Sequence, residues 1–220
     1  MASTTSPAEL LSKVVPYVKE YMSHYDGSHD FAHIERVLGL AHLLRAQDPS
    51  RYDATVVSLC ALLHDVGDKK YLKPGQDATT AIRDVLLSLG ADAELAEKVQ
   101  GICSAVSYSS ETSEGGKDKV EEVIAKWPEL EVVQDADRLD AIGAVGVARC
   151  WAFGGAKGRD LENGVRHFEE KLVRLEGMTK TRRGREMARE RTERIREVRR
   201  WWQEEVEESR RGLEGLDFLG

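Results

Sequence analysis

Long apolar runs are missing from this 220-residue sequence, and no stretch approaches the roughly 20 consecutive apolar residues that a membrane span requires. The first seven residues have neither a basic segment nor an apolar core, so they predict no signal peptide and no membrane anchor. Segments with the alternation of a strand, and internal repeats, are also missing. These absences favour a helical protein of the cytoplasm, with the nucleus as the alternative compartment.

Cysteine and positive charge are both scarce. The three cysteines, Cys60, Cys103 and Cys150, are far apart and each lies in an apolar helical context, which predicts free thiols in a reducing compartment. The chain has 32 Lys and Arg against 39 Asp and Glu, for a net charge of −7. A general nucleic-acid surface needs an excess of cations, so we expect no nucleic-acid partner, although a local basic patch is compatible with this balance.

The length and composition favour one domain. A chain of 220 residues can bury one sizeable core, and nothing in the sequence marks a second. Charged residues make up 32% and hydrophobic residues 41%, which suits a helical domain with a solvated surface. We therefore expect a single all-α domain over residues 1–220, with its core at about 10–202 and a long charged helix at its C-terminal end.

Apolar residues recur at helical spacing along most of the chain, with capping residues and Gly or Pro between the segments. We expect loops at 109–118 and 153–158. The small residues of the segment 135–151 should let that helix pack closely against the apolar helix that ends at His64. Expected helices cover residues 7–22, 30–47, 53–64, 77–89, 92–108, 120–124, 135–151, 163–176 and a last one that begins at Thr179 or Thr181.

Three segments carry candidate metal ligands. The apolar helix 55–63 leads directly into His64 and Asp65, and an adjacent imidazole and carboxylate offer two ligands to one cation if other helices supply the rest. Residues 29–37 open a helix with histidines at both ends of its first turn. Residues 133–141 place acidic side chains in an otherwise apolar stretch.

These segments resemble the HD-domain superfamily of metal-dependent phosphohydrolases, whose pattern is H…HD…D. The resemblance runs from about Leu10 to about Trp202 and is closest to a small single-domain branch with the motifs S-H-D-x-x-H-x-x-R-V and D-A-D-R-L-D-A-I-G. It implies an HD-domain helical bundle. It also implies four metal ligands, which fall on His33, His64, Asp65 and Asp137.

Other acidic and histidine residues allow alternatives at the same site. His29 and His33 are four residues apart and could form a metal pair, but residues 28–30 more simply hold the helix cap. Asp140 follows Asp137 by one turn and could orient a ligand or a water molecule. Asp135 could simply cap a helix.

The ligand set and the histidine spacing together predict one divalent ion. Two imidazoles and two carboxylates suit Mn, Fe, Co, Ni or Zn, with Mg also allowed and Mn favoured. Two-metal members of the superfamily draw extra histidines from the chain between the HD pair and the last Asp. Residues 66–136 contain no histidine, so we expect one metal ion per chain.

The resemblance also indicates residues that act on the substrate. Asp68 matches a position where relatives carry a carboxylate that acts on the attacking water, with capping of the next loop as the alternative. Lys69 and Lys70 could neutralise phosphates, although exposed lysines are common. Arg138 could bind phosphate or pair with a neighbouring acid.

The leading hypothesis is a mononuclear phosphohydrolase acting on a nucleotide or a similar small phosphate ester, with release of pyrophosphate from a nucleoside triphosphate as one form of it. The alternatives are an HD enzyme with non-phosphate hydrolase or lyase chemistry, and a non-catalytic module stabilised by its metal. Trp201 and Trp202 in the last helix suggest a homodimer, but packing within the chain explains them equally well.

Overall fold

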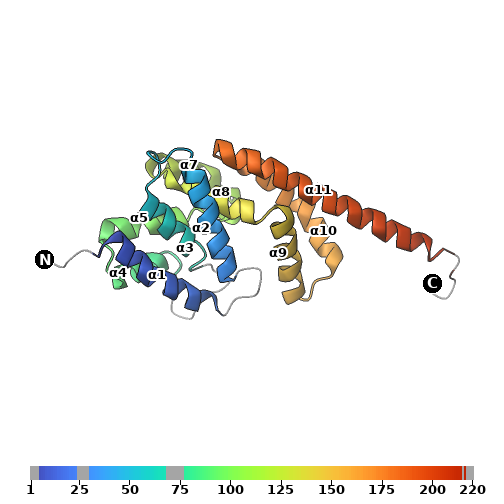
Figure 1. The fold of residues 1–220 in the computed structure, drawn as a ribbon, viewed down its shortest axis with the longest axis horizontal. Coiled ribbons are helices and arrows are strands. Elements are labelled where there is room, and N and C mark those ends of the chain that lie inside the picture. The colour runs from blue at the N-terminus through green and yellow to red at the C-terminus, as the bar shows by residue number, and fades with distance from the viewer. Residues whose placement is uncertain (1–4, 24–29, 68–76, 215, 217–220) are drawn as a thin grey trace.

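The computed structural model describes residues 5–23, 30–67, 77–214 and 216. Within these ranges the chain forms α-helices, one 3₁₀ helix and no strand, which confirms the all-α expectation (Figure 1). Among the described helices, none combines the length and apolarity needed to cross a membrane. The helices are α1 (Pro7–Met22), α2 (Phe31–Arg45), α3 (Ala54–Leu63), α4 (Ala81–Ser88), α5 (Ala93–Cys103), α6 (Tyr108–Thr112), α7 (Gly116–Lys126), α8 (Glu129–Asp140), α9 (Gly143–Ala156), α10 (Leu161–Glu170), η1 (Leu172–Met178) and α11 (Arg182–Arg211).

Helix α3 lies at the centre of a bundle made by α1 to α8. It packs against α1, α2, α5 and α8, and α2 also packs against α8. Four helices begin where the sequence predicts a cap, because the side chains of Ser6, Asp30, Asp53 and Asp92 each accept a hydrogen bond from a backbone N–H in the first turn. These caps fix where α1, α2, α3 and α5 start, and α2 and α3 carry part of the candidate site.

The long helix expected over residues 135–151 is wrong, because the structure has two helices there. Helix α8 begins earlier, at Glu129, and a turn at Ala141 and Ile142 separates it from α9. Gly143 starts α9 with φ of 75°, a left-handed conformation that favours glycine, and a Cβ there would meet the Arg191 side chain at 3.1 Å. The break redirects α9, which packs mainly against α8, α10 and α11, so only the α8 part of the expected helix packs closely against α3.

Three smaller expectations also differ from the structure. The expected loop at 109–118 contains the short helix α6 and the start of α7. Helix α9 continues through Ala156, where a loop was expected to begin at 153. The expected helix 163–176 is instead α10, beginning at Leu161, followed by η1. The last helix begins as expected, with the Thr181 side chain as its cap.

Helices α9, α10 and α11, with η1, form an arm that projects from the bundle in Figure 1. The Trp151 ring packs against Phe168 at 5.4 Å between ring centroids and against Trp202 at 5.7 Å, which ties the three helices together. Trp201, the neighbour of Trp202, is 49% exposed. The two adjacent tryptophans therefore have different surroundings, and contacts within the chain account for Trp202.

Candidate metal centre

Four side chains from three parts of the bundle converge on one small volume. His33 comes from the first turn of α2, His64 and Asp65 come from the turn that ends α3, and Asp137 comes from α8. The His33 Nε2 atom lies 3.3 Å from His64 Nε2, 3.4 Å from Asp65 Oδ2 and 3.7 Å from Asp137 Oδ1. His64 Nε2 lies 3.6 Å from Asp65 Oδ1 and 3.8 Å from Asp137 Oδ1.

These separations fit donors arranged around one cation. Ligand atoms about 2.1 Å from an ion stand about 3.0 to 3.4 Å apart in octahedral and tetrahedral geometry, so the four side chains need to move by only a few tenths of an ångström. Among the described residues, His33, His64 and Asp137 have ligand atoms that all lie within 4.8 Å of one another. The donor set, two imidazole nitrogens and two carboxylates, is one that divalent transition metals accept.

Both imidazoles are oriented so that Nε2 faces the cluster. The Nδ1 atom of His64 lies 2.9 Å from the Ala61 carbonyl oxygen, and the Nδ1 atom of His33 lies 2.8 Å from Asp140 Oδ2. Because each of these partners is an acceptor, Nδ1 carries the proton and Nε2 keeps its lone pair for a metal. A carboxylate or carbonyl behind the ring is the usual support of a metal-binding histidine.

The electrostatics of the cluster favour a positive charge. Burial by itself would lower the pKa of His33, but the hydrogen bonds with Asp140 and then Asp65 outweigh it and raise the pKa to about 9. The His33 side chain is only 1% exposed, so this protonation follows from the surrounding carboxylates and not from solvent. The carboxylates around His33 therefore favour a cation at this position, and metal binding through Nε2 would require loss of the proton there.

Two arginines hold the Asp140 carboxylate behind His33. Arg36 donates from Nε to Oδ1 at 2.6 Å and from a terminal nitrogen to Oδ2 at 3.1 Å, and Arg149 donates to Oδ2 at 3.0 Å. Burial would raise the pKa of Asp140, but its bonds with His33 and Arg36 lower the pKa below its ordinary value. The expectation that Asp140 orients a ligand therefore agrees with its position.

The arginines themselves were missed by reading the sequence. Arg36 follows His33 by three residues on the same helix face, so helical spacing could have placed it beside the site. Arg149 lies beyond the break between α8 and α9, and no signal in the sequence shows that α9 folds back toward Asp140.

The expectation that Asp135 caps its own helix is wrong, because α8 begins at Glu129 and the Asp135 side chain binds the two residues that precede α11. Its carboxylate accepts hydrogen bonds from the backbone N–H groups of Lys180 and Thr181 and from the Thr181 hydroxyl, at 2.7 to 3.1 Å. Those groups open α11, so the side chain attaches the arm to α8. Burial raises the pKa of Asp135, although these hydrogen bonds oppose the shift. A Cβ at Gly184 would approach Asp135 Oδ2 to 2.4 Å, so the contact requires glycine there.

Arg138 lies in a buried ion pair, which argues against the substrate-binding role expected for it. Its side chain is 2% exposed, donates to the Met178 carbonyl and pairs with Glu111. Glu111 also accepts from Lys180 at 3.0 Å and from Gln134 at 3.1 Å. Burial would raise the pKa of Glu111, but the Arg138 contact lowers it. The structure favours the second interpretation, that Arg138 pairs with an acid.

The remaining expected site residues are placed differently. Asp68, Lys69 and Lys70 lie outside the described residues, and so do His24 and His29. His42 lies on α2, away from the cluster, with its Nε2 2.9 Å from the Ser58 hydroxyl.

The fold and this cluster define a helical protein with a candidate metal site made of His and Asp residues, and the chain belongs to the HD-domain family. A family model of the HD domain matches residues 30–142, which include all four converging side chains. The uncharacterised protein YpgQ of Bacillus subtilis is 36% identical over 182 residues, covering 80% of this chain and 83% of YpgQ.

Solved structures give the same relationship. The crystal structure of Bacillus subtilis YpgQ in complex with ADP matches with a TM-score of 0.73 and 31% identity, over 90% of this chain and 96% of that one. An HD-superfamily hydrolase from Bacillus thuringiensis matches with a TM-score of 0.69 and 28% identity, over 92% of this chain and 99% of that one. These likenesses cover both the bundle and the arm.

Proposed function

We propose that this protein is a metal-dependent phosphohydrolase that acts on a nucleotide or a similar small phosphate ester. The single observation that carries the proposal is the convergence of His33, His64, Asp65 and Asp137 at ligand-to-ligand distances. The hydrolase name of a solved relative and the ADP in the YpgQ crystal support the substrate class. Release of pyrophosphate from a nucleoside triphosphate is the form of this reaction that we test first.

In this proposal the four side chains hold one divalent ion, with Mn²⁺ favoured. When bound, the ion supplies a Lewis acid for the phosphoryl group. Asp140 keeps His33 in the correct tautomer, and the Ala61 carbonyl does the same for His64. Asp68 acts as the base toward the attacking water, and Lys69 and Lys70 neutralise the phosphates of the substrate.

The direction from which a substrate approaches follows from the burial of the ligands. The imidazoles of His33 and His64 are 1% and 2% exposed, whereas the side chains of Asp65 and Asp137 are 17% and 27% exposed. The histidines therefore lie on the buried side of the site, and the carboxylates lie on the side that faces solvent. An ion held by these four side chains would be accessible from the side of the carboxylates, as a catalytic site needs and a closed structural site does not.

The test is a substrate screen with metal-loaded protein. We would saturate the protein with Mn²⁺, offer nucleoside mono-, di- and triphosphates and other small phosphate esters, and measure phosphate and pyrophosphate separately. We expect turnover of at least one nucleotide that disappears with chelator and returns with Mn²⁺. A fully metal-loaded protein that releases neither product from any of these compounds would contradict the proposal and favour the non-catalytic metal-stabilised module.

A further inference from the structure

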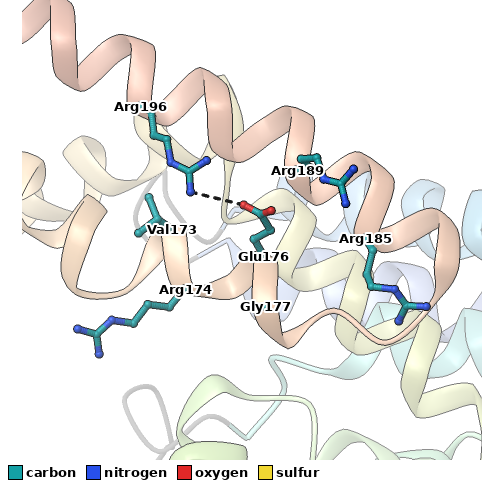
Figure 2. A pocket seen from close by; sticks show the side chains of 7 residues that line it. All are labelled: Val173, Arg174, Glu176, Gly177, Arg185, Arg189 and Arg196. Carbon is teal, nitrogen blue, oxygen red and sulfur yellow. Dashed lines mark ion pairs between the residues drawn. The ribbon is translucent and has the colours of Figure 1, made fainter.

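A second site of different chemistry lies between η1 and α11. Figure 2 shows this arginine groove, a cavity of about 560 Å³. The two helices face each other across it, and it shares no residue with the metal cluster. It is lined by Val173, Arg174, Glu176, Gly177, Arg185, Arg189 and Arg196.

The charge of the groove is opposite to that of the chain. Four guanidinium groups line it against the single carboxylate of Glu176, although the whole protein carries a net charge of −7. Arg196 lies 3.7 Å from Glu176 and also pairs with Glu193, so its single positive charge is shared between two carboxylates, and the lining holds three further arginines. The lining therefore keeps an excess of positive charge.

Most of this positive charge has no acidic partner. Arg174 and Arg189 form no ion pair or side-chain hydrogen bond with any residue that the structure describes, and Arg185 donates to the Lys180 carbonyl, which carries no charge. Elsewhere on α11, Arg183 pairs with Glu186 and Arg199 pairs with Glu169, whereas Arg194 and Arg200 also lack an ion pair with a described residue but do not line the groove. These guanidinium groups leave an excess of positive potential along the groove, which favours the binding of an anion.

The distribution of the arginines indicates the kind of anion. In Figure 2, Arg189 and Arg196 lie beside Glu176 at the middle of the groove, while Arg174 and Arg185 extend toward its opposite ends. A single compact anion at the middle would meet the Glu176 carboxylate. An anion with several linked charges could instead contact guanidinium groups on both sides of it, and arginine binds phosphate oxygens in a bidentate way.

We propose that the arginine groove binds a small oligophosphate, pyrophosphate or longer, at a site separate from the metal cluster. The volume of the cavity lies in the range of small-molecule sites, about 300 to 1,000 Å³. Bound phosphates would bridge η1 and α11 and so stabilise the packing of these two helices against each other. This proposal does not depend on the proposed function, because none of its residues belongs to the metal site.

The experiment must separate this groove from the metal site, which would also attract phosphates. We would titrate inorganic triphosphate into the full-length D65A variant, and into the unaltered protein stripped of metal with chelator, by isothermal calorimetry at low salt. We expect saturable binding at one site in both samples. Sulfate and inorganic phosphate should bind at least tenfold more weakly, because each can reach only part of the groove.

Matched substitutions test the residues. Replacing Arg174 and Arg189 together by Gln should weaken triphosphate binding at least tenfold. Neither side chain has a partner to lose, so the far-UV circular dichroism and the melting temperature should stay unchanged. Arg200→Gln is the control, because Arg200 is exposed on the same helix and does not line the groove. It should leave the affinity within a factor of two.

Three results would overturn the proposal. The first is no binding of triphosphate to metal-free protein at low salt. The second is equal weakening by R200Q and by the double variant, which would mean a diffuse electrostatic effect without a site. The third is tighter binding of single-stranded DNA or a Glu-rich peptide than of triphosphate, with the same dependence on Arg174 and Arg189, because the groove would then serve a macromolecule.

Discussion

The bundle and the arm use the same type of secondary structure in opposite ways. Eight of the ten residues of α3 are buried, whereas only four of the thirty residues of α11 are buried. Helix α3 is stabilised by apolar contacts on all sides, while α11 is mostly solvated and dense in Arg and Glu, some of them paired one turn apart. The candidate metal site lies in the bundle and the arginine groove lies in the arm.

This difference explains where each kind of site can form. Two imidazoles with almost no exposure need a rigid, water-poor surrounding to stay in place, and the core of the bundle provides it. Guanidinium groups without a bound anion need hydration, and the surface of the arm keeps them in contact with water. Helix α8 connects the two regions, because Asp137 faces the metal cluster while Asp135 and the Leu139 carbonyl bind α11.

The largest expected effect comes from removing a ligand inside the bundle. Asp65→Ala should abolish metal retention and turnover together, measured by elemental analysis after gel filtration and by product release. Asp68→Ala is the matched comparison: it should keep the metal and lower turnover about 10²-fold or more if Asp68 is a general base. Full activity of D68A would refute the base assignment, and normal metal content in D65A would refute the ligand assignment.

The next effect tests the connection between the regions. Asp135→Ala leaves the N–H groups of Lys180 and Thr181, just before α11, without their buried acceptor, which should lower the free energy of unfolding by about 2 to 3 kcal/mol. Urea denaturation measures this change, and metal content should stay normal because the cluster lies on the other face of α8. Asp160→Ala removes the exposed cap of α10 and should cost only about 1 kcal/mol. Equal losses in the two variants would mean that Asp135 is no more than a surface cap.

A smaller effect tests whether the arm supports the metal site. Asp140→Asn weakens the hold on His33, so metal affinity should fall about 10- to 100-fold, measured by competition with a chelating dye. Arg149→Gln removes only the contact that α9 contributes and should lower the affinity less. Asp118→Asn, on the exposed surface of α7, is the control and should change nothing. Unchanged affinity in D140N would show that the two regions are independent at this point.

The smallest effect lies within the arm. Trp202→Ala removes the contact with Trp151 and should lower the free energy of unfolding by about 1 kcal/mol, whereas Trp201→Ala should stay within about 0.5 kcal/mol because that ring is half exposed. Thermal denaturation at two protein concentrations measures both. A large, concentration-dependent loss in W201A would instead indicate the homodimer that the adjacent tryptophans suggest.

Helix starts were predictable wherever a local signal defines them. Asp53 and Asp92 hydrogen-bond within their own first turn, so the sequence contains all of the interaction. The break before Gly143 was not predictable in the same way. Residues 135–151 have helical spacing throughout, and Arg191, which packs against Gly143 and donates to the Leu139 carbonyl beside the turn, is 48 positions further along the chain.

The residues of the candidate site also fall into two groups, those that a local motif predicts and those that depend on contacts with distant parts of the chain. His33, His64, Asp65 and Asp137 could be named because each lies in its own extended motif, and the structure brings those four together. The role of Arg138 could not be decided, because its partner Glu111 lies in a segment expected to be a loop. The arginine groove could not be predicted from the sequence either. Its residues come from two helices, and the mixed Arg and Glu residues of α11 are typical of any solvated helix.

The sequence by itself determined which residues can chemically bind a metal and where the helices with a local cap begin, because ligand chemistry and capping act over one or two turns. Only the tertiary structure decided which groups support those ligands, which face of α8 meets the arm and which arginines stay without a partner. Those outcomes depend on contacts between residues tens of positions apart, and such contacts exist only once the helices have packed.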